Sequence, residues 1–265
     1  MITYKNLGNN GRFGNQLFQY AALCGIAKTN GYEYGVPYSN KSPIEIYNFC
    51  LPECFDNLEA KDSSLIYNFS FEIAETNFNY SPDLVNIPDN TNYTHGYFQT
   101  EKYFKHCKEN LKKQFEFNTT ITQLGNTYLQ LFKDYKLISM HLRLGDYASS
   151  NGKHPVCPIE YYKSALELLP DDAIIFIFSD EINKAKEIFN SINKKIIYPT
   201  TNNKFIDMYL MTKCNYHIIA NSSFSWWGAW LANSEKVIAP SKWFGDMACM
   251  PQNWSDIYCE DWSIL

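Results

Sequence analysis

The stretch AIIFIFS, residues 173–179, is an unbroken apolar run that ends in Ser179 and is followed by Asp180. A run that is apolar at every position, and not only at alternate ones, is typical of a strand buried on both faces of a parallel sheet. Such a sheet carries helices on both faces, so the stretch predicts an α/β fold.

Strands and helices alternate around this run along the chain from Tyr135. We predict strands at KLISMHL, AIIFIFS, KKIIY and YHIIA, with KVIAP as the last one, and helices at PIEYYKSALELL, DEINKAKEIF, NKFIDMYLMTKC and SFSWWGAWLA. The chain opens with a similar series, in which the strand MITYKNL, a glycine-rich loop and a helix stopped by Gly31 follow one another. We therefore expect two α/β halves that face one another, residues 1–135 and residues 136–265.

The middle of the chain has weaker patterns. Residues 37–100 are rich in Asn, Pro, Ser and Tyr and indicate few clear elements. The segment TEKYFKHCKENLKKQFEF favours an amphipathic helix, and NTTITQLGN, near residues 118–126, reads as a loop.

The composition limits the classes of function. The net charge of −5 disfavours a sequence-independent grip on nucleic acid, so no nucleic-acid partner is expected. No apolar run reaches the ~20 residues of a membrane-spanning helix, and the first residues do not resemble a signal peptide. These features favour a cytoplasmic location and leave room for peripheral association with a membrane. The eight cysteines include no Cys-x-x-Cys pair, which favours free thiols over disulfides or zinc.

Four loops are selected by the fold itself. In parallel α/β sheets ligands bind beyond the carboxyl ends of the strands, where the loops lead into helices. Here those loops are residues 8–14, 143–157, 179–182 and 220–226, and all four are rich in polar residues or glycine.

The second of these loops follows HLRLGDY, residues 141–147. On a strand, His141 and Arg143 project to the same face, and Asp146 lies just beyond the strand end. A guanidinium at this position suits bidentate contact with a phosphate. The alternative is a structural Arg143–Asp146 pair with His141 in the core. A His/Asp relay to a nucleophilic serine has no Gly-x-Ser-x-Gly turn to complete it.

The first and third loops are less specific. In GNNGRFGNQ, Gly8, Gly11 and Gly14 permit tight turns, and Arg12 and Asn15 supply hydrogen-bond donors. A plain strand-to-helix turn explains this loop equally well. In FSDE, capping of the next helix by Ser179 or Asp180 is a sufficient explanation.

The fourth loop begins NSSFSWW, residues 221–227. We predict that Ser223 or Ser225 caps a helix whose free N–H groups attract an anion, and that the tryptophans pack in the core. Together with Arg143 this helix start predicts a pyrophosphate site. No Asp-x-Asp and no His/Glu cluster with metal spacing occurs, so no metal is expected. The arginine and the helix start would then neutralise the negative charge of the diphosphate.

The motifs GRFGNQLFQYA, HLRLGDY, FSDE, NSSFSWWGAWL and PSKWF, in this order, resemble those of the α-1,2-fucosyltransferases of glycosyltransferase family eleven. Related arginine-containing patterns occur in α-1,6-fucosyltransferases and protein O-fucosyltransferases. The resemblance implies a GT-B type fold, with two Rossmann-like domains facing across a cleft and GDP-fucose held mainly by the second. It implies an inverting, metal-independent transfer of fucose from GDP-β-L-fucose to the 2-hydroxyl of a terminal galactose in a glycan.

Carried over residue by residue, the resemblance implies roles for ten positions. Arg143 grips the diphosphate, and Asp146 and Asn15 join it as catalytic candidates, with Asp146 either a base or an orienting partner of Arg143. The donor-binding candidates are His141, Arg143, Asp180, Ser222, Ser223, Phe224, Gly14 and Arg12. The alternatives are a transferase of the same fold that uses another nucleotide sugar, and a non-catalytic carbohydrate-binding protein.

Overall fold

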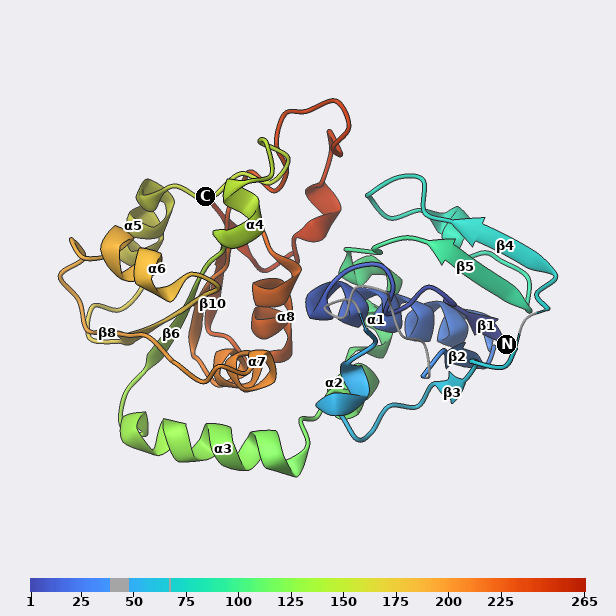
Figure 1. Cartoon of the computed structure of the whole chain (residues 1–265), viewed down its shortest axis with the longest axis horizontal. Helices are drawn as coiled ribbons and strands as arrows, with labels where there is room; N and C mark the ends of the chain where they lie inside the picture. Colours follow the sequence, from blue (N-terminus) through green and yellow to red (C-terminus); the bar gives the residue numbers. More distant parts are fainter. Residues whose placement is uncertain (39–47, 67) are drawn as a thin grey trace. The chain divides into compact units, whose positions relative to one another are not determined.

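The computed structural model describes residues 1–38, 48–66 and 68–265, and within them the chain forms two compact units. The first unit comprises Met1–Asn118 and Asn253–Cys259, and the second unit comprises Thr119–Gln252 and Glu260–Leu265. Each unit holds one sheet in which neighbouring strands pair in parallel (Figure 1). The α/β class predicted from the apolar run is confirmed.

The sheet of the second unit has six strands in the order β11-β10-β9-β6-β7-β8. Their bounds are β6 Leu137–Leu142, β7 Ile174–Ser179, β8 Ile196–Ile197, β9 Tyr216–Ile218, β10 Lys236–Ala239 and β11 Ser263–Ile264. The predicted strands are all present, but KVIAP is not the last one, because β11 near the end of the chain pairs with β10. In β7 every residue except Ser179 is buried, as its apolar run requires.

Helices cover both faces of this sheet (Figure 1). They are α3 Thr119–Leu129, α4 Gly145–Ala148, α5 Ile159–Glu167, α6 Ile182–Ile188, α7 Lys204–Thr212 and α8 Ser223–Leu231. Alternate residues of β6 and β7, among them Met140 and Ile177, form one core with α5 and α6. On the other face His141 meets α8 and Phe176 meets the aromatic rings of the α3 region. Successive strand residues thus serve opposite faces.

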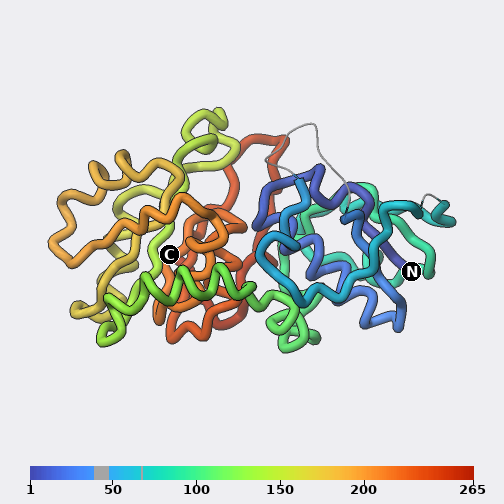
Figure 2. Tube along the Cα trace, turned by 60° about the horizontal axis from the view of Figure 1, so that its bottom comes forward, coloured from blue at the N-terminus to red at the C-terminus, as the bar shows by residue number. Residues whose placement is uncertain are grey.

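The segment NTTITQLGN, predicted to be a loop, belongs to α3 except for its first residue, Asn118, and this moves the boundary of the second unit to residue 119. The hydroxyl of Tyr209 on α7 donates to the Asn126 side-chain oxygen over 2.7 Å, and Gly125 lies against the Tyr209 ring. Figure 2 shows α3 running beside α7. Packing therefore makes a helix of residues with modest helix propensity, and it assigns residues 119–135 to the unit that follows.

The sheet of the first unit has five strands in the order β3-β2-β1-β5-β4. They are β1 Ile2–Thr3, β2 Tyr34–Val36, β3 Lys61–Asp62, β4 Phe71–Ala74 and β5 Thr91–His95. Three of them, β3 to β5, lie in the stretch for which few elements were predicted; residues 39–47 and 67 of that stretch are outside the described residues. These strands are short, which explains why periodicity did not indicate them.

The long helix of the first unit, α1 Phe13–Asn30, ends as predicted at Gly31, whose φ of 69° is left-handed. The predicted amphipathic helix near residue 108 is broken into shorter pieces. Its first part forms two short 3-10 helices, and only the rest is α-helical; the pieces are Glu101–Tyr103, Lys105–Cys107 and α2 Lys108–Gln114.

Candidate functional site

Three of the four predicted loops meet at one edge of the second unit. Strands β9, β6 and β7 are neighbours and run parallel, so their carboxyl ends lie side by side. The segments 220–226, 143–157 and 179–182 follow these ends directly. The fourth loop, 8–14, belongs to the first unit and is described with that unit below.

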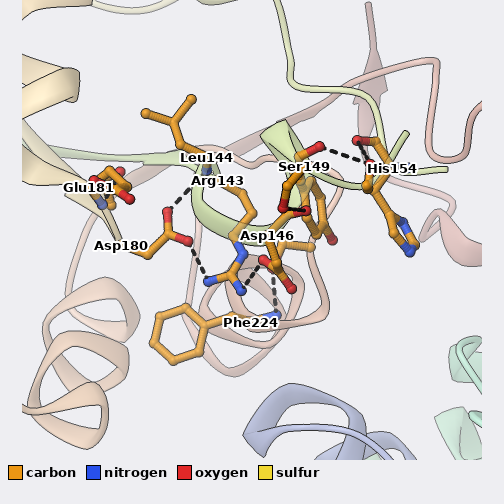
Figure 3. Close-up of polar contacts among 12 residues, drawn as sticks. Arg143, Leu144, Asp146, Ser149, His154, Asp180, Glu181 and Phe224 are labelled. Carbon is orange, nitrogen blue, oxygen red and sulfur yellow. Dashed lines mark hydrogen bonds and ion pairs between the residues drawn. The ribbon is translucent and has the colours of Figure 1, made fainter. Parts of the chain in front are cut away.

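Arg143 lies between two carboxylates, as Figure 3 shows. One terminal nitrogen donates to the Asp146 Oδ1 over 2.6 Å, and the other is 3.0 Å from the Asp180 Oδ2. The guanidinium also lies 5.6 Å from the centre of the Tyr147 ring. The Asp146 side chain is 51% exposed and the Arg143 side chain 17%, so the arginine is the more buried partner of this pair. The Arg143–Asp146 pair, which was the alternative to phosphate contact, is present, and Asp180 extends it.

Asp180 does not cap the following helix, which corrects one prediction. The residue before α6 is Glu181, and the nearby Ser179 hydroxyl accepts from its N–H over 3.1 Å. Asp180 turns to the neighbouring loop instead, where its Oδ1 accepts from the Leu144 N–H over 3.0 Å. A Cβ on Gly145 would come within 2.3 Å of the Asp180 Oδ2. The close approach of these two loops therefore requires glycine at position 145.

His141 is enclosed beneath this edge with 4% of its surface exposed. Its Nδ1 is 2.9 Å from the Ser225 hydroxyl, and its backbone oxygen accepts from the Tyr162 hydroxyl over 2.9 Å. Burial, followed by the charge of Arg143, lowers its pKa to about 3, so the imidazole is neutral at neutral pH. His141 thus joins β6 to α8 from the core side, and the structure brings its ring to the helix start and not to open solvent.

Helix α8 begins at Ser223, as predicted, but its cap is Ser222 and not Ser223 or Ser225. The Ser222 hydroxyl accepts from the Phe224 N–H over 3.4 Å, and its backbone is extended. Ser223 and Phe224 are half-buried, whereas Ser225 is buried against His141. The predicted packing of the tryptophans is confirmed, since Trp226, Trp227 and Trp230 are all buried.

Tyr147 and Asn221 are residues of this edge that the sequence reading did not single out. The Tyr147 hydroxyl donates to the Asn221 backbone oxygen over 2.9 Å. The Asn221 side chain donates in turn to the backbone oxygens of Pro155 and Trp243 over 3.0 and 2.9 Å. Both residues stand inside the quoted motifs, so their position was available as a signal, but the direction of their side chains was not.

In the first unit, the first turn of α1 places Asn15 beside Gln99. The Gln99 side-chain nitrogen donates to the Asn15 Oδ1 over 2.8 Å. Gly11 has a left-handed φ of 95°, and a Cβ there would meet the Asn15 side chain at 2.6 Å. Arg12 is exposed and precedes the helix. Gly14 does not form a turn, because it is a buried residue of α1.

Within residues 1–38, 48–66 and 68–265, no group of three or more His, Cys, Asp or Glu side chains is placed to hold a metal ion. In the same ranges no helix combines the length and the apolar character that crossing a bilayer demands.

Comparison of the sequence with curated proteins finds bacterial and mammalian transferases. The chain is 29% identical to the O-antigen biosynthesis glycosyltransferase WbnK of Escherichia coli, over 88% of this chain and 93% of that protein. It is 36% identical to an α-1,2-colitosyltransferase of Escherichia coli, over 56% of this chain and 55% of that protein. Human galactoside α-(1,2)-fucosyltransferase 1 is 22% identical over 86% of this chain and 65% of its own length. The chain thus spans just over half of the colitosyltransferase and about two thirds of the human enzyme.

Solved structures share the fold. The α-1,6-fucosyltransferase NodZ soaked with GDP-fucose superposes with a TM-score of 0.57 at 14% identity, over 87% of this chain and 92% of that one. POFUT1 in complex with GDP superposes with a TM-score of 0.53 at 10% identity, over 90% and 96%. At these identities the likeness concerns the α/β fold alone.

The sequence model of one family covers nearly the whole chain. The model described as glycosyl transferase family 11 matches residues 3–265, which include both units and all four loops. The order of motifs that suggested this family is therefore confirmed by an independent comparison, and the chain belongs to glycosyl transferase family 11.

Proposed function

We propose that this protein transfers L-fucose from GDP-β-L-fucose to the 2-hydroxyl of a terminal β-galactoside in a glycan, with inversion at the anomeric carbon. The observation that carries the proposal is the place of Arg143, which stands at the end of β6 next to the start of α8. A guanidinium and the N–H groups of a helix start are the donors that a diphosphate needs. Because the chain belongs to glycosyl transferase family 11, we assign this anion site to glycosyl transfer.

The diphosphate competes with one carboxylate in our proposal. A guanidinium has five N–H donors, and the two carboxylates approach its two terminal nitrogens. Asp146 is half exposed and can turn into solvent, whereas Asp180 is less exposed and also bonded to the Leu144 N–H. We therefore assign Asp180 the role of fixing Arg143, and we expect the phosphates to displace Asp146. Ser222, Ser223 and Phe224 then offer the remaining donors.

The transfer forms one bond and breaks one. The acceptor hydroxyl oxygen attacks the anomeric carbon, the bond from that carbon to the phosphate oxygen breaks, and GDP leaves with the electron pair. Arg143 and the start of α8 stabilise the negative charge that grows on the leaving diphosphate. The proposed mechanism requires no metal ion for this step. The hydroxyl proton passes to Asp146 or to solvent. His141 is not the base in this scheme, because its imidazole is buried against Ser225.

Residues of the first unit complete the proposal. Asn15 presents a carboxamide whose oxygen is held by Gln99, which leaves its nitrogen to donate to a sugar oxygen. We propose that it contacts the reacting sugars, with Gly14 and Arg12 beside it. His141 supports the donor site through Ser225 without touching the ligand.

A second donor is favoured by one observation, the 36% identity to an α-1,2-colitosyltransferase over half of the chain. Colitose differs from fucose in lacking the 3-hydroxyl group, so both donors present the same diphosphate to Arg143. The two readings differ only in the sugar pocket. GDP-fucose and GDP-colitose, offered in parallel at equal concentration, separate them by the rate of sugar transfer.

The main test uses labelled GDP-fucose with a small panel of β-galactosides and matched sugars whose 2-hydroxyl is blocked. We expect transfer to the free 2-hydroxyl only, and thermal stabilisation by GDP but not by UDP or dTDP. Stabilisation by UDP or dTDP alone would point to another nucleotide sugar. Binding of glycans without any binding of GDP would identify a carbohydrate-binding protein and overturn the proposal.

A further inference from the structure

Tyr147 touches both halves of the candidate anion site. Its ring centre lies 5.6 Å from the Arg143 guanidinium carbon, a distance at which a cation is attracted to the ring face. Its hydroxyl donates over 2.9 Å to the backbone oxygen of Asn221, directly before the cap of α8. One side chain therefore connects the loop after β6 with the turn after β9.

The phenol is suited to a permanent contact of this kind. Burial raises the pKa of Tyr147 far above its usual range, so the hydroxyl remains a proton donor at any physiological pH. The ring also stacks on His154, with centroids 4.9 Å apart and an angle of 21° between the planes. His154 contacts Phe244 in turn, at 5.6 Å between centroids. Tyr147 is thus held by contacts with both ends of its own loop, and His154 connects it to Phe244 beyond β10.

Asn221 makes the receiving side of this contact rigid. It is 2% exposed, and its side-chain nitrogen donates to Pro155 and Trp243 while its Oδ1 lies 3.5 Å from the Cys157 sulfur. The residue before the helix cap is therefore fixed by two segments of the chain, the end of the loop after β6 and the chain beyond β10. A donor into its backbone oxygen is held at a defined distance from the helix start.

We propose that Tyr147 is a positioning residue that sets the distance between the Arg143 guanidinium and the N–H groups at the start of α8, and so selects a diphosphate over a single phosphate. This inference rests on the proposed function, because it assumes that GDP binds at this edge. A cradle for two linked phosphates needs two donor groups at a fixed separation, and preorganisation of that kind contributes directly to affinity. A single phosphate can be bound by either group alone.

The test compares the affinities for GDP and GMP in three proteins, by isothermal titration calorimetry. They are the wild type, Tyr147→Phe, and Tyr161→Phe as the matched control. The control loses the same chemical group, because the Tyr161 hydroxyl donates to the backbone oxygens of Ile219 and Ile238 over 2.7 and 3.0 Å. Both variants lose a hydrogen bond from a tyrosine hydroxyl to a backbone oxygen, so both should melt at a lower temperature.

We expect the wild type to bind GDP more tightly than GMP. In Tyr147→Phe the GDP affinity should fall about tenfold with little change for GMP, whereas Tyr161→Phe should keep the wild-type ratio. An unchanged ratio in Tyr147→Phe overturns the inference while leaving the proposed function intact. A wild type that binds neither nucleotide overturns the proposed function itself.

A second variant covers the case in which Tyr147→Phe does not fold. His154→Gln removes the stacked ring but leaves the Tyr147 hydroxyl and its acceptor in place. We expect this variant to lower the ratio of GDP to GMP affinity about threefold. A ratio equal to that of the wild type contradicts the positioning role.

Discussion

The carboxyl edges of the two sheets carry different chemistry. In the second unit the edge is charged, with Arg143 held between Asp146 and Asp180. In the first unit two pairs of polar side chains near the strand ends consist of amides and an imidazole, and we call them the amide edge. The pairs are Asn15–Gln99 and Asn10–His95, whose polar atoms are 2.8 and 3.2 Å apart. A fixed cation suits phosphates, whereas amides that donate and accept suit sugar hydroxyls. The contrast teaches that two similar α/β units of one chain can present different chemical groups at their strand ends.

The largest effect is expected at the charged edge. Arg143→Lys keeps the positive charge but loses the planar fork that reaches two acceptors at once. We expect fucosyl transfer to fall by a factor of about a hundred to a thousand, the usual result of losing one preorganised donor to a developing charge. The rate of transfer from labelled GDP-fucose measures it.

The control for this variant removes a positive charge elsewhere in the same unit. Lys194 pairs with Asp171 over 2.5 Å, and Lys194→Gln should leave transfer unchanged. Near-wild-type transfer by Arg143→Lys would remove the charged edge from the mechanism.

At the amide edge a smaller and different effect is expected. Asn15→Ala removes a side chain that we place against the reacting sugars, which should lower the turnover number about tenfold, equivalent to about 1.4 kcal/mol. The affinity for GDP should stay the same, since the diphosphate is assigned to the second unit. Steady-state kinetics combined with GDP titration separate the two quantities. If Asn15→Ala weakens GDP binding as strongly as Arg143→Lys does, the proposed division between the units is wrong.

Two glycines allow a matched pair of substitutions, one in each unit. In Gly145→Ala the new methyl carbon would lie 2.3 Å from the Asp180 Oδ2, and in Gly25→Ala it would lie 2.2 Å from the Tyr103 backbone oxygen. Overpacking of this kind costs roughly 1–3 kcal/mol of stability, so both proteins should melt earlier. Only Gly145→Ala should also weaken GDP binding, because Asp180 orients Arg143. Equal GDP affinities in the two variants would show that Asp180 has no such role.

The smallest effect concerns pH. Burial raises the pKa of Glu75 in the first unit to about 7 and lowers those of His141 and His217 in the second to about 3 and about 4. Between pH 7 and 5 the folded first unit binds more protons than its unfolded form, so it gains stability as the pH falls. In the second unit the unfolded imidazoles bind more protons, so it loses stability, although Asp207, with a pKa raised to about 6, partly offsets this.

Hydrogen exchange at pH 7 and pH 5 measures this difference. After correction for intrinsic rates, amides of β5 should become better protected at pH 5 and those of β6 less protected. A common change in both sheets would mean that these buried groups do not govern the pH response of the units.

The second unit was predictable because its signals are long. Five consecutive apolar residues in β7 leave few alternatives to a buried strand, and the loops that follow parallel strands must gather at one edge. The first unit was harder to predict, because a two-residue strand such as β1 is defined by its neighbours and not by its own pattern. Likewise α3 exists because Gly125 fits against Tyr209, which is a tertiary contact.

The site was predictable as a set of loops and not as a set of contacts. Sequence placed Arg143, Asp146, Asp180 and the α8 turn at one edge, and the structure brings them together there. It did not indicate that Asp180 turns to Arg143 in place of capping α6, because both roles use the same residue type. The contacts of Tyr147 could not be predicted either, because a tyrosine after an aspartate has no local sequence pattern that fixes the direction of its side chain.

The central claim is that the Arg143 guanidinium and the start of α8 bind the same diphosphate. A crystal structure of the wild-type protein with GDP tests it most directly. We predict phosphate oxygens within hydrogen-bond distance of Arg143 and of the N–H groups at Ser223 and Phe224, with Asp180 still paired to Arg143. GDP bound at another surface, or with its phosphates in contact with neither group, would contradict the account.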